Sequence, residues 1–309
     1  MKVSIAICTW NRSRLLRQTL QQLKQLNIPA DVTWEIVVVD NGSSDDTRAI
    51  IESFQGQLPV QYVFELQSGH ARCRNAAIAN VTGELILWTD NDVIVEPNWL
   101  AAYVAGARKF PQAAFFGGKI LPVFESRKPI WLAETWPKCH PVYAARDLGN
   151  DEFELPPQQY PFGANFAVRT AVQKQFPFNV DWGRSASAML GDDEINVLDR
   201  MARAGHVGIW LPTAALKHFI PDDRATVRYV SRYFVGQGQA NVLKEAPTMK
   251  SKFHALRVAI HNRSCFALKR RFSPADEWVS HLIRASIAWG EFRAWSHSTA
   301  VDPTAGINQ

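Results

Sequence analysis

The chain has 309 residues, of which 47% are hydrophobic, so it can bury a sizeable core in one large domain or in a domain with an appendage. Residues 1–243 hold 24 Lys+Arg and 24 Asp+Glu, whereas residues 244–309 hold 10 and 5, so the net charge of +5 belongs to the tail. The spacings typical of zinc fingers are missing, which argues against a nucleic-acid partner.

The four cysteines lie far apart and show neither metal-ligand spacing nor a disulfide framework, which favours a reducing compartment. The first apolar run is too short for a signal peptide, and no apolar run is long enough to span a membrane. We therefore expect a cytoplasmic protein, which could also work at the inner face of the plasma membrane.

Patterns typical of strands and helices alternate through the amino-terminal half. We expect Ser13 to cap the first helix, whose Leu16, Leu20 and Leu23 share one face. The alternation predicts an α/β fold with a doubly wound, mostly parallel sheet of the nucleotide-binding type. The predicted strands cover residues 3–8, 35–39, 60–64 and 85–89.

Asp90 and Asp92 follow the last of these strands, and a second apolar run begins directly after them. In an open α/β sheet ligands bind at the carboxyl ends of the strands, and paired carboxylates there suit Mg²⁺ or Mn²⁺. Thr9, Asn11 and Asp40 follow earlier strands and are expected at the same edge. The alternative is a polar turn without a metal.

Four segments with polar and charged residues occur along the chain, at residues 8–12, 39–47, 71–75 and 89–92. In order and spacing they resemble the signature segments of family 2 glycosyltransferases with the GT-A fold. The resemblance implies that Thr9, Asn11 and Asp40 hold the nucleotide base, and that Arg74 lies near the nucleotide and diphosphate. It further implies that Asp90 and Asn91 contact the donor while Asp92 binds the metal. Trp10 and Asn41 depart from the usual pattern and leave the base unidentified.

Residues 120–160 are rich in proline and aromatic residues and read as a long irregular excursion. Its Trp131 and Trp136 could stack on sugars or pack within the protein. The segment that follows resembles the family's Gly-x-Asn strand, which would place Gly163 and Asn165 on the acceptor side.

Three consecutive acids, Asp192, Asp193 and Glu194, open an amphipathic helix. Acids favour a helix amino terminus electrostatically, which is a sufficient structural explanation. Residues 191–193 also resemble the family's Gly-Glu-Asp motif, which implies that Asp193 is the catalytic base that takes the proton of the acceptor hydroxyl. Because Asp192 stands where glutamate is usual, the two aspartates could exchange roles.

His218 follows a predicted strand at residues 207–211. A lone histidine is more often structural, but the resemblance implies that His218 completes the metal site with Asp92, which suits Mn²⁺ or Mg²⁺. Residues 223–239 resemble a helix of bacterial members that build polysaccharides. Its arginines could face the leaving diphosphate or be solvated.

Residues 250–297 predict two basic helices around residues 272–274. We expect the second to pack against the catalytic domain, with peripheral docking on an anionic bilayer as the alternative. Residues 298–309 read as a loose end. The residues that share one face of the second helix are Trp278, Leu282, Ala285, Trp289 and Phe292.

We divide the chain into a GT-A catalytic domain at residues 1–243 and a helical appendage at residues 244–309. Within the catalytic domain, residues 1–118 form the nucleotide-sugar-binding half and residues 119–243 the acceptor and catalytic-base half.

The resemblance implies an inverting, metal-dependent glycosyltransferase of polysaccharide biosynthesis. It would move a sugar from a nucleotide-diphosphate sugar, with a UDP-sugar favoured, to a hydroxyl of a glycan or lipid-linked acceptor. One alternative is a sugar nucleotidyltransferase, which the lack of glycine after the first strand disfavours. The other is a non-catalytic nucleotide- or glycan-binding protein on the same fold.

Overall fold

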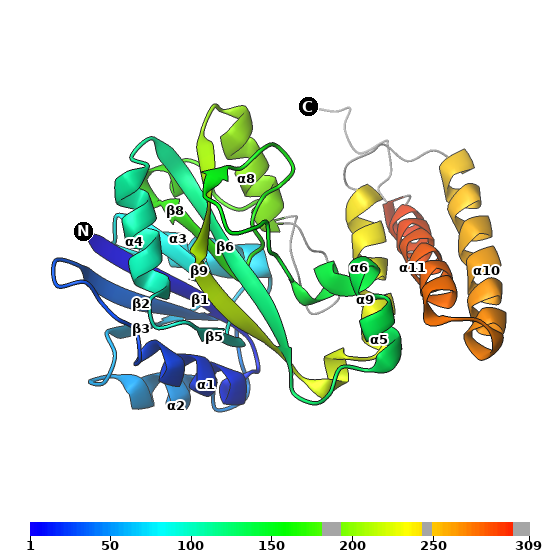
Figure 1. Ribbon diagram of the computed structural model, residues 1–309, viewed down its shortest axis with the longest axis horizontal. Helices are drawn as coiled ribbons and strands as arrows, with labels where there is room; N and C mark the ends of the chain where they lie inside the picture. Colours follow the sequence, from blue (N-terminus) through cyan, green and yellow to red (C-terminus); the bar gives the residue numbers. More distant parts are fainter. Residues whose placement is uncertain (181–192, 243–248, 299–309) are drawn as a thin grey trace, which may run out of the picture. The chain divides into compact units, whose positions relative to one another are not determined.

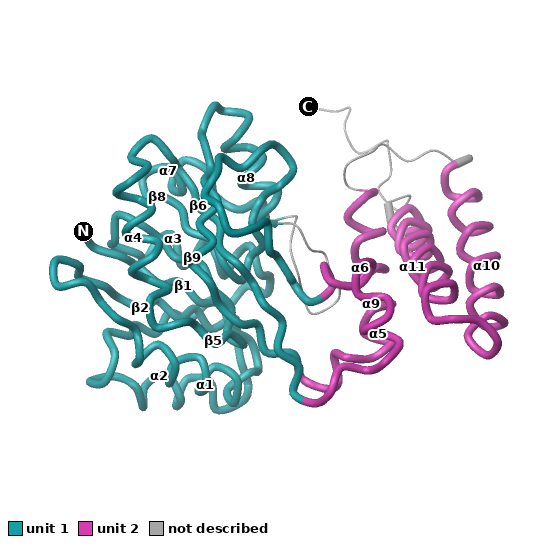
Figure 2. Tube along the Cα trace, viewed as in Figure 1, with its two compact units in different colours: residues 1–125, 143–186, 192–220 teal, residues 126–142, 187–191, 221–309 magenta. Residues whose placement is uncertain are grey.

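The computed structural model describes residues 1–180, 193–242 and 249–298, and the chain forms two compact units (Figure 2). The boundary that we predicted at residue 243 between a catalytic domain and an appendage stays a prediction. The last segment of the first compact unit ends at residue 220. Of the described residues, the first unit comprises 1–125, 143–180 and 193–220, and the second comprises 126–142, 221–242 and 249–298.

The described part of the first unit contains one sheet of nine strands in the order β3-β2-β1-β4-β8-β6-β9-β5, with β7 paired to β9 (Figure 1). Strands β3, β2, β1 and β4 are parallel, which confirms the predicted nucleotide-binding sheet, but β8 runs antiparallel to both β4 and β6. The strands are β1 (Lys2–Thr9), β2 (Thr33–Asp40), β3 (Val60–Phe64), β4 (Leu85–Thr89), β5 (Val93–Val95), β6 (Ala113–Phe124), β7 (Phe153–Glu154), β8 (Asn165–Arg169) and β9 (Val207–Ile220).

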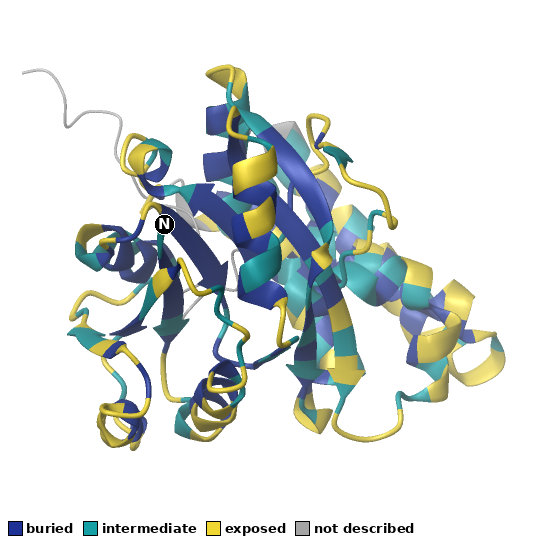
Figure 3. Ribbon diagram, turned by 60° about the vertical axis from the view of Figure 1, so that its left-hand side comes forward, coloured by how far each residue is buried: buried dark blue, intermediate teal, exposed yellow. Residues whose placement is uncertain are grey.

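Helices cover both faces of this sheet, because successive strand residues such as Ile5 and Ala6 point to opposite sides. Ile5 belongs to a core with α1, α2 and α4, and Ala6 to a core with α3 and α8. Figure 3 shows the buried strands between helices whose outer sides are exposed. The helices are α1 (Ser13–Leu23), α2 (Thr47–Phe54), α3 (His70–Asn80), α4 (Trp99–Lys109), α7 (Thr170–Gln173) and α8 (Asp193–Arg203).

We had predicted that Ser13 caps the amino terminus of α1, and this prediction was wrong. Ser13 is the first helical residue, and its backbone N–H donates to the carboxylate of Asp45 at 2.9 Å. The same carboxylate accepts the backbone N–H of Thr47, the first residue of α2, at 3.1 Å. Burial opposes ionisation of Asp45, but these hydrogen bonds outweigh it and lower its pKa. One acid on a neighbouring loop therefore serves two helix ends.

Strand β9 continues well beyond the predicted residues 207–211. Its pairing with β6 shifts register between Gly118 and Ile120, and it then continues to Ile220. Such an irregularity lets a strand absorb extra residues and go on pairing. As a result His218 lies within a strand, opposite Val93 of β5.

The second unit is helical in its described part. Its long helix α11 packs against both α9 and α10, and Gly238 of α9 and Gly290 of α11 allow the close approach. A Cβ atom on either glycine would collide with a backbone carbonyl of the other helix. The helices are α5 (Ile130–Glu134), α6 (Trp136–Cys139), α9 (Val227–Val242), α10 (Met249–Phe272) and α11 (Ala275–Ser298), with short 3₁₀ turns η1 (His140–Tyr143) and η2 (Asp222–Arg224).

The predicted apolar face of α11 is mostly packed, since Trp278, Leu282 and Ala285 are buried. Trp131 of α5 lies against Trp278 with ring centroids 5.6 Å apart, which supports a packing role for this tryptophan. The prediction of two basic helices was wrong in one respect. Helix α11 has three acids and two arginines, so the positive charge belongs to α10. No helix in the described residues is long and apolar enough to cross a membrane.

Candidate active site

The polar residues that follow the parallel strands meet at one edge of the sheet. Thr9 pairs with Asp40 across β1 and β2, and Ile7 pairs with Thr89 across β1 and β4, so the carboxyl ends of all three strands are level. Asn91 donates from Nδ2 to Thr9 Oγ1 at 2.9 Å. This is the edge at which open α/β sheets bind ligands.

Hydrogen bonds join the loops after β1 and β2. Asn11 donates its backbone N–H to Ser43 Oγ at 2.8 Å, and its side-chain oxygen accepts the backbone N–H of Ser44 at 2.8 Å. Asp40 accepts the backbone N–H of Ser43 at 2.9 Å and the hydroxyl of Tyr62 at 3.1 Å. The structure therefore brings together Thr9, Asn11 and Asp40, and their role in holding a base stays a prediction.

Asp90, Asp92 and His218 form what we call the cation cluster. Each offers one ligand atom, and the three atoms lie within 4.8 Å of one another. His218 Nδ1 lies 2.9 Å from the carbonyl oxygen of Tyr143 and must donate to it, so in the neutral imidazole Nε2 carries the free electron pair. That Nε2 is 3.2 Å from Asp92 Oδ1. Two carboxylates and an imidazole oriented by a backbone carbonyl fit Mn²⁺ or Mg²⁺.

Arg12 is a member of this edge that our sequence analysis missed. Its Nη1 lies 3.0 Å from Asp92 Oδ2, and its side chain is 37% exposed. It follows Asn11 in the first signature segment, but only the fold shows that it meets an aspartate 80 residues away. The guanidinium of Arg12 therefore places a positive charge next to the cation cluster.

Asp193, Glu194, His70 and Arg74 form what we call the acid-base cluster. Asp193 Oδ2 lies 3.0 Å from His70 Nδ1 and 3.1 Å from Arg74 Nη1. Arg74 also reaches Glu194 Oε2 at 3.4 Å, and only 3% of its side chain is exposed. The guanidinium stands over the rings of Trp88, Phe166 and Phe178, which stabilise a cation.

The two acids of this cluster ionise differently. Burial opposes ionisation of Asp193, but Arg74 and His70 outweigh it and hold its pKa well below the usual range. Burial and the charge of Asp193 raise the pKa of Glu194 to about 7. Burial and Arg74 act against the charged form of His70, yet Asp193 raises its pKa overall. Asp193 is therefore the permanent anion of the cluster.

Gly163 and Asn165 have distinct places. Gly163 donates its backbone N–H to Glu194 Oε1 at 2.9 Å, and a Cβ atom there would collide with Arg74. Asn165 is fully buried and accepts from Trp99 Nε1 at 2.7 Å and from Tyr103 at 2.8 Å. Its amide nitrogen donates to two backbone carbonyls. Asn165 thus shapes the sheet, and a direct role at the acceptor stays a prediction.

Most of the predicted site residues gather at this edge, while Asp192 lies outside the described residues. Three further residues were missed: Arg12, His70 and Glu194. Glu194 stood in the acidic run that opens a predicted helix, so its position carried a weak signal, whereas the sequence analysis gave no role to His70. The raised pKa of Glu194 follows from packing that the sequence does not reveal.

Comparison with known proteins supports the resemblance to family 2 glycosyltransferases. A family model described as "Glycosyl transferase family 2" matches residues 4–172. The succinoglycan biosynthesis protein ExoM of Rhizobium meliloti is 25% identical over 264 residues, which cover 84% of this chain and 79% of ExoM.

Two solved structures share the fold. TarS of S. aureus in complex with UDP superposes with a TM-score of 0.56 at 15% identity, covering 96% of this chain and 92% of that one. A mannosyltransferase, PcManGT from Pyrobaculum calidifontis, in complex with GDP-Man and Mn²⁺, also gives 0.56, at 18% identity, covering 97% of this chain and 75% of that one. At these identities the likeness concerns the fold alone.

Proposed function

The chain belongs to glycosyl transferase family 2 and is a glycosyltransferase, and from this premise we propose that it is an inverting, metal-dependent enzyme that uses a nucleotide-diphosphate sugar. The observation that carries the proposal is the cation cluster of Asp90, Asp92 and His218 at the carboxyl edge of the sheet. A divalent cation there would bind the diphosphate, and Thr9 and Asp40 end β1 and β2 at the same edge.

We assign donor binding to this edge residue by residue. Thr9, Asn11 and Asp40 would hold the base, Asp90 and Asn91 the ribose side, and Asp92 and His218 the cation. Mn²⁺ or Mg²⁺ at this position would neutralise charge on the departing diphosphate. Arg12, beside Asp92, adds positive charge from the chain itself. A neighbour of the same fold binds UDP and another binds GDP-Man with Mn²⁺, and among these donors we favour a UDP-sugar.

The acid-base cluster would serve the acceptor. In an inverting transfer the acceptor oxygen bonds to the anomeric carbon as the bond to the diphosphate breaks, and a base takes the hydroxyl proton. We assign this base to Asp193, which is ionised at neutral pH. Glu194, with a pKa of about 7, is the competing candidate because its proton affinity matches neutral pH. Gly163 lies on this side and contacts Glu194.

We further propose that the acceptor is a hydroxyl of a glycan or of a lipid-linked acceptor in the synthesis of a polysaccharide. The likeness to ExoM, a protein of succinoglycan biosynthesis, supports this role. Four free cysteines in the described structure accord with work in the cytoplasm.

Calorimetric titration with UDP, GDP and dTDP, each with Mn²⁺ and again with EDTA, tests the donor site. We expect UDP to bind at least about tenfold more tightly with Mn²⁺, since the cation joins the carboxylates to the diphosphate. Equal binding of one diphosphate under both conditions would remove the metal from the proposal. If no diphosphate bound in either case, a non-catalytic glycan-binding protein would be the better account.

A further inference from the structure

Helix α10 has an unusual distribution of charge. Residues 249–272 contain seven lysines and arginines and no acidic residue. In the described structure Lys269 pairs with Glu277, whereas Arg257, Arg263 and Arg271 have no carboxylate within 4.0 Å. A helix that serves only to pack against its neighbours does not need this excess of positive charge.

Large apolar side chains stand among these arginines on what we call the outer face of α10. Phe253, Ile260 and Leu268 are each at least 59% exposed. Spacings of seven and eight residues place them on one side of the helix, together with Arg257 and Arg271. The opposite side of the helix is buried and consists of Ala255, Ala259, Asn262 and Phe266.

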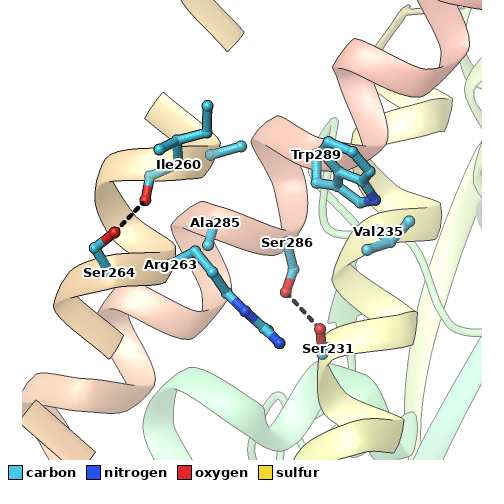
Figure 4. A pocket seen from close by; sticks show the side chains of 9 residues that line it. Ser231, Val235, Ile260, Arg263, Ser264, Ala285, Ser286 and Trp289 are labelled. Carbon is cyan, nitrogen blue, oxygen red and sulfur yellow. Dashed lines mark hydrogen bonds between the residues drawn. The ribbon is translucent and has the colours of Figure 1, made fainter. Parts of the chain in front are cut away.

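A cavity of about 530 Å³ adjoins this face between α9, α10 and α11 (Figure 4). Ile260 belongs to both the face and the cavity, and Trp289 of α11 adds an aromatic wall. Figure 4 shows Arg263 reaching from α10 toward the hydrogen-bonded hydroxyls of Ser231 and Ser286, which are 2.8 Å apart. The cavity thus combines apolar walls with one guanidinium and a pair of hydroxyls.

The chemistry of the face and the cavity fits one kind of partner. Exposed apolar residues in a group mark a binding surface. A partner that covers these residues also lies against several arginines. Because α10 has no acidic residue to neutralise them, the partner must supply the negative charge. A bilayer with anionic phospholipid meets both demands, because apolar side chains enter the acyl boundary while arginines reach the headgroup phosphates.

We propose that the outer face of α10 docks on a bilayer containing anionic phospholipid, and that Arg263 receives the phosphate of one lipid at the adjoining cavity. The docking helix is α10, whereas the sequence had pointed to the aromatic face of α11, which is mostly buried. The proposal does not depend on the sugar donor and survives if the assignment of the active site fails.

Flotation with vesicles tests the proposal directly. We expect the protein to float with vesicles of phosphatidylcholine and phosphatidylglycerol, to stay behind with phosphatidylcholine alone, and to lose binding as salt is added. Replacing Phe253 and Leu268 by aspartate should abolish flotation. Reversing the charge of one arginine, in Arg257→Glu or in Arg271→Glu, should weaken vesicle binding by at least about fivefold, the equivalent of about 1 kcal/mol. Arg263→Met should lower it by a similar factor.

Matched controls come from the first unit. Arg17 and Leu66 are exposed residues on other elements, so Arg17→Glu and Leu66→Asp should leave flotation unchanged. Hydrogen exchange on vesicles should slow in peptides from α10 more than in peptides from the sheet. The melting temperature and UDP affinity of each variant establish that it is folded.

Several outcomes would overturn the proposal. Equal flotation with neutral vesicles would remove the role of charge, and unchanged flotation of the α10 variants would remove the face itself. Full competition by soluble glycerol phosphate would mean a site for a small phosphate ligand. A shift in size-exclusion volume caused by the α10 variants, without lipid, would identify the face as a contact between copies of the chain.

Discussion

The cation cluster and the acid-base cluster each contain an aspartate that pairs with an arginine, which in the first case lies outside the cluster. Arg12 lies 3.0 Å from Asp92 and Arg74 lies 3.1 Å from Asp193, but the side chain of Arg12 is 37% exposed and that of Arg74 only 3%. An exposed guanidinium can leave its partner for water at little cost, whereas a buried one cannot. The first cluster can therefore accept a cation from outside, while the second carries its own.

The largest effect on sugar transfer should come from Asp92, whose carboxylate pairs with Arg12 and would bind the metal. Asp92→Asn should lower sugar transfer by about 10⁴-fold at saturating Mn²⁺, because the charge of the diphosphate is no longer neutralised in the transition state. Turnover of donor and acceptor measures it. Glu96→Gln, a partly exposed acid paired with Lys217, is the matched control and should keep normal turnover. Normal turnover of Asp92→Asn would remove this residue from the site.

The acid-base cluster should fail in a different way. Asp193→Asn should keep metal-dependent UDP binding and lower transfer by about 10³-fold, because the proton of the acceptor hydroxyl has lost its acceptor. Glu194→Gln should cost less than tenfold in the same assay. If the two variants showed the reverse order, Glu194 would be the base and Asp193 would only hold Arg74 and His70 in place.

The two arginines should differ in stability by their burial. Arg74→Met should lower the free energy of unfolding by about 3 kcal/mol, because it leaves buried acids without their cation. Arg12→Met is the matched control and should cost about 0–1 kcal/mol. Urea denaturation measures both. Equal losses would contradict the contrast between a displaceable and a fixed counter-ion.

Gly163 tests how tightly Arg74 is held. Gly163→Ala should destabilise the protein by about 2 kcal/mol, because the added methyl group must push the guanidinium from its place. Gly149→Ala makes a poor comparison because of its positive φ, so Ala105→Ser, at an exposed position of α4, serves as the mild control. A neutral Gly163→Ala in urea denaturation would mean that Arg74 can shift freely.

The smallest effect is one of pH. The pKa of Glu194 is raised to about 7 in the folded protein from an ordinary 4.5, so folding binds a proton in this range and stability falls as pH rises toward 7. Glu194→Gln lacks this loss. Its stability relative to the parent should therefore rise by about 1 kcal/mol between pH 5 and pH 8, a modest figure because the side chain is 15% exposed. A pH-independent difference would contradict the raised pKa.

Local patterns in the sequence predicted the parallel strands and the edge at which polar residues gather. Runs of apolar residues such as those around Val37 and Leu87 indicate strands buried on both faces, and strand ends follow from polar turns. The GT-A fold, the helical appendage and the pairing of Asp92 with His218 were therefore within reach of the sequence together with the family resemblance.

Features that depend on distant packing were out of reach. The carboxylate of Asp45 caps a helix more than 30 residues earlier, and β9 continues because β6 offers a partner across a register shift. Neither feature has a local pattern. In the same way, the exposure of Arg12 and the burial of Arg74 separate two pairs that look alike in the sequence.

The central claim is that Asp90, Asp92 and His218 hold a divalent cation when the donor binds. Pulsed electron paramagnetic resonance of Mn²⁺ with the protein and UDP tests it most directly. The account predicts coupling of Mn²⁺ to a histidine nitrogen that disappears in His218→Gln, and loss of bound Mn²⁺ in Asp92→Asn. Mn²⁺ bound without such coupling, and equally well in Asp92→Asn, would contradict it.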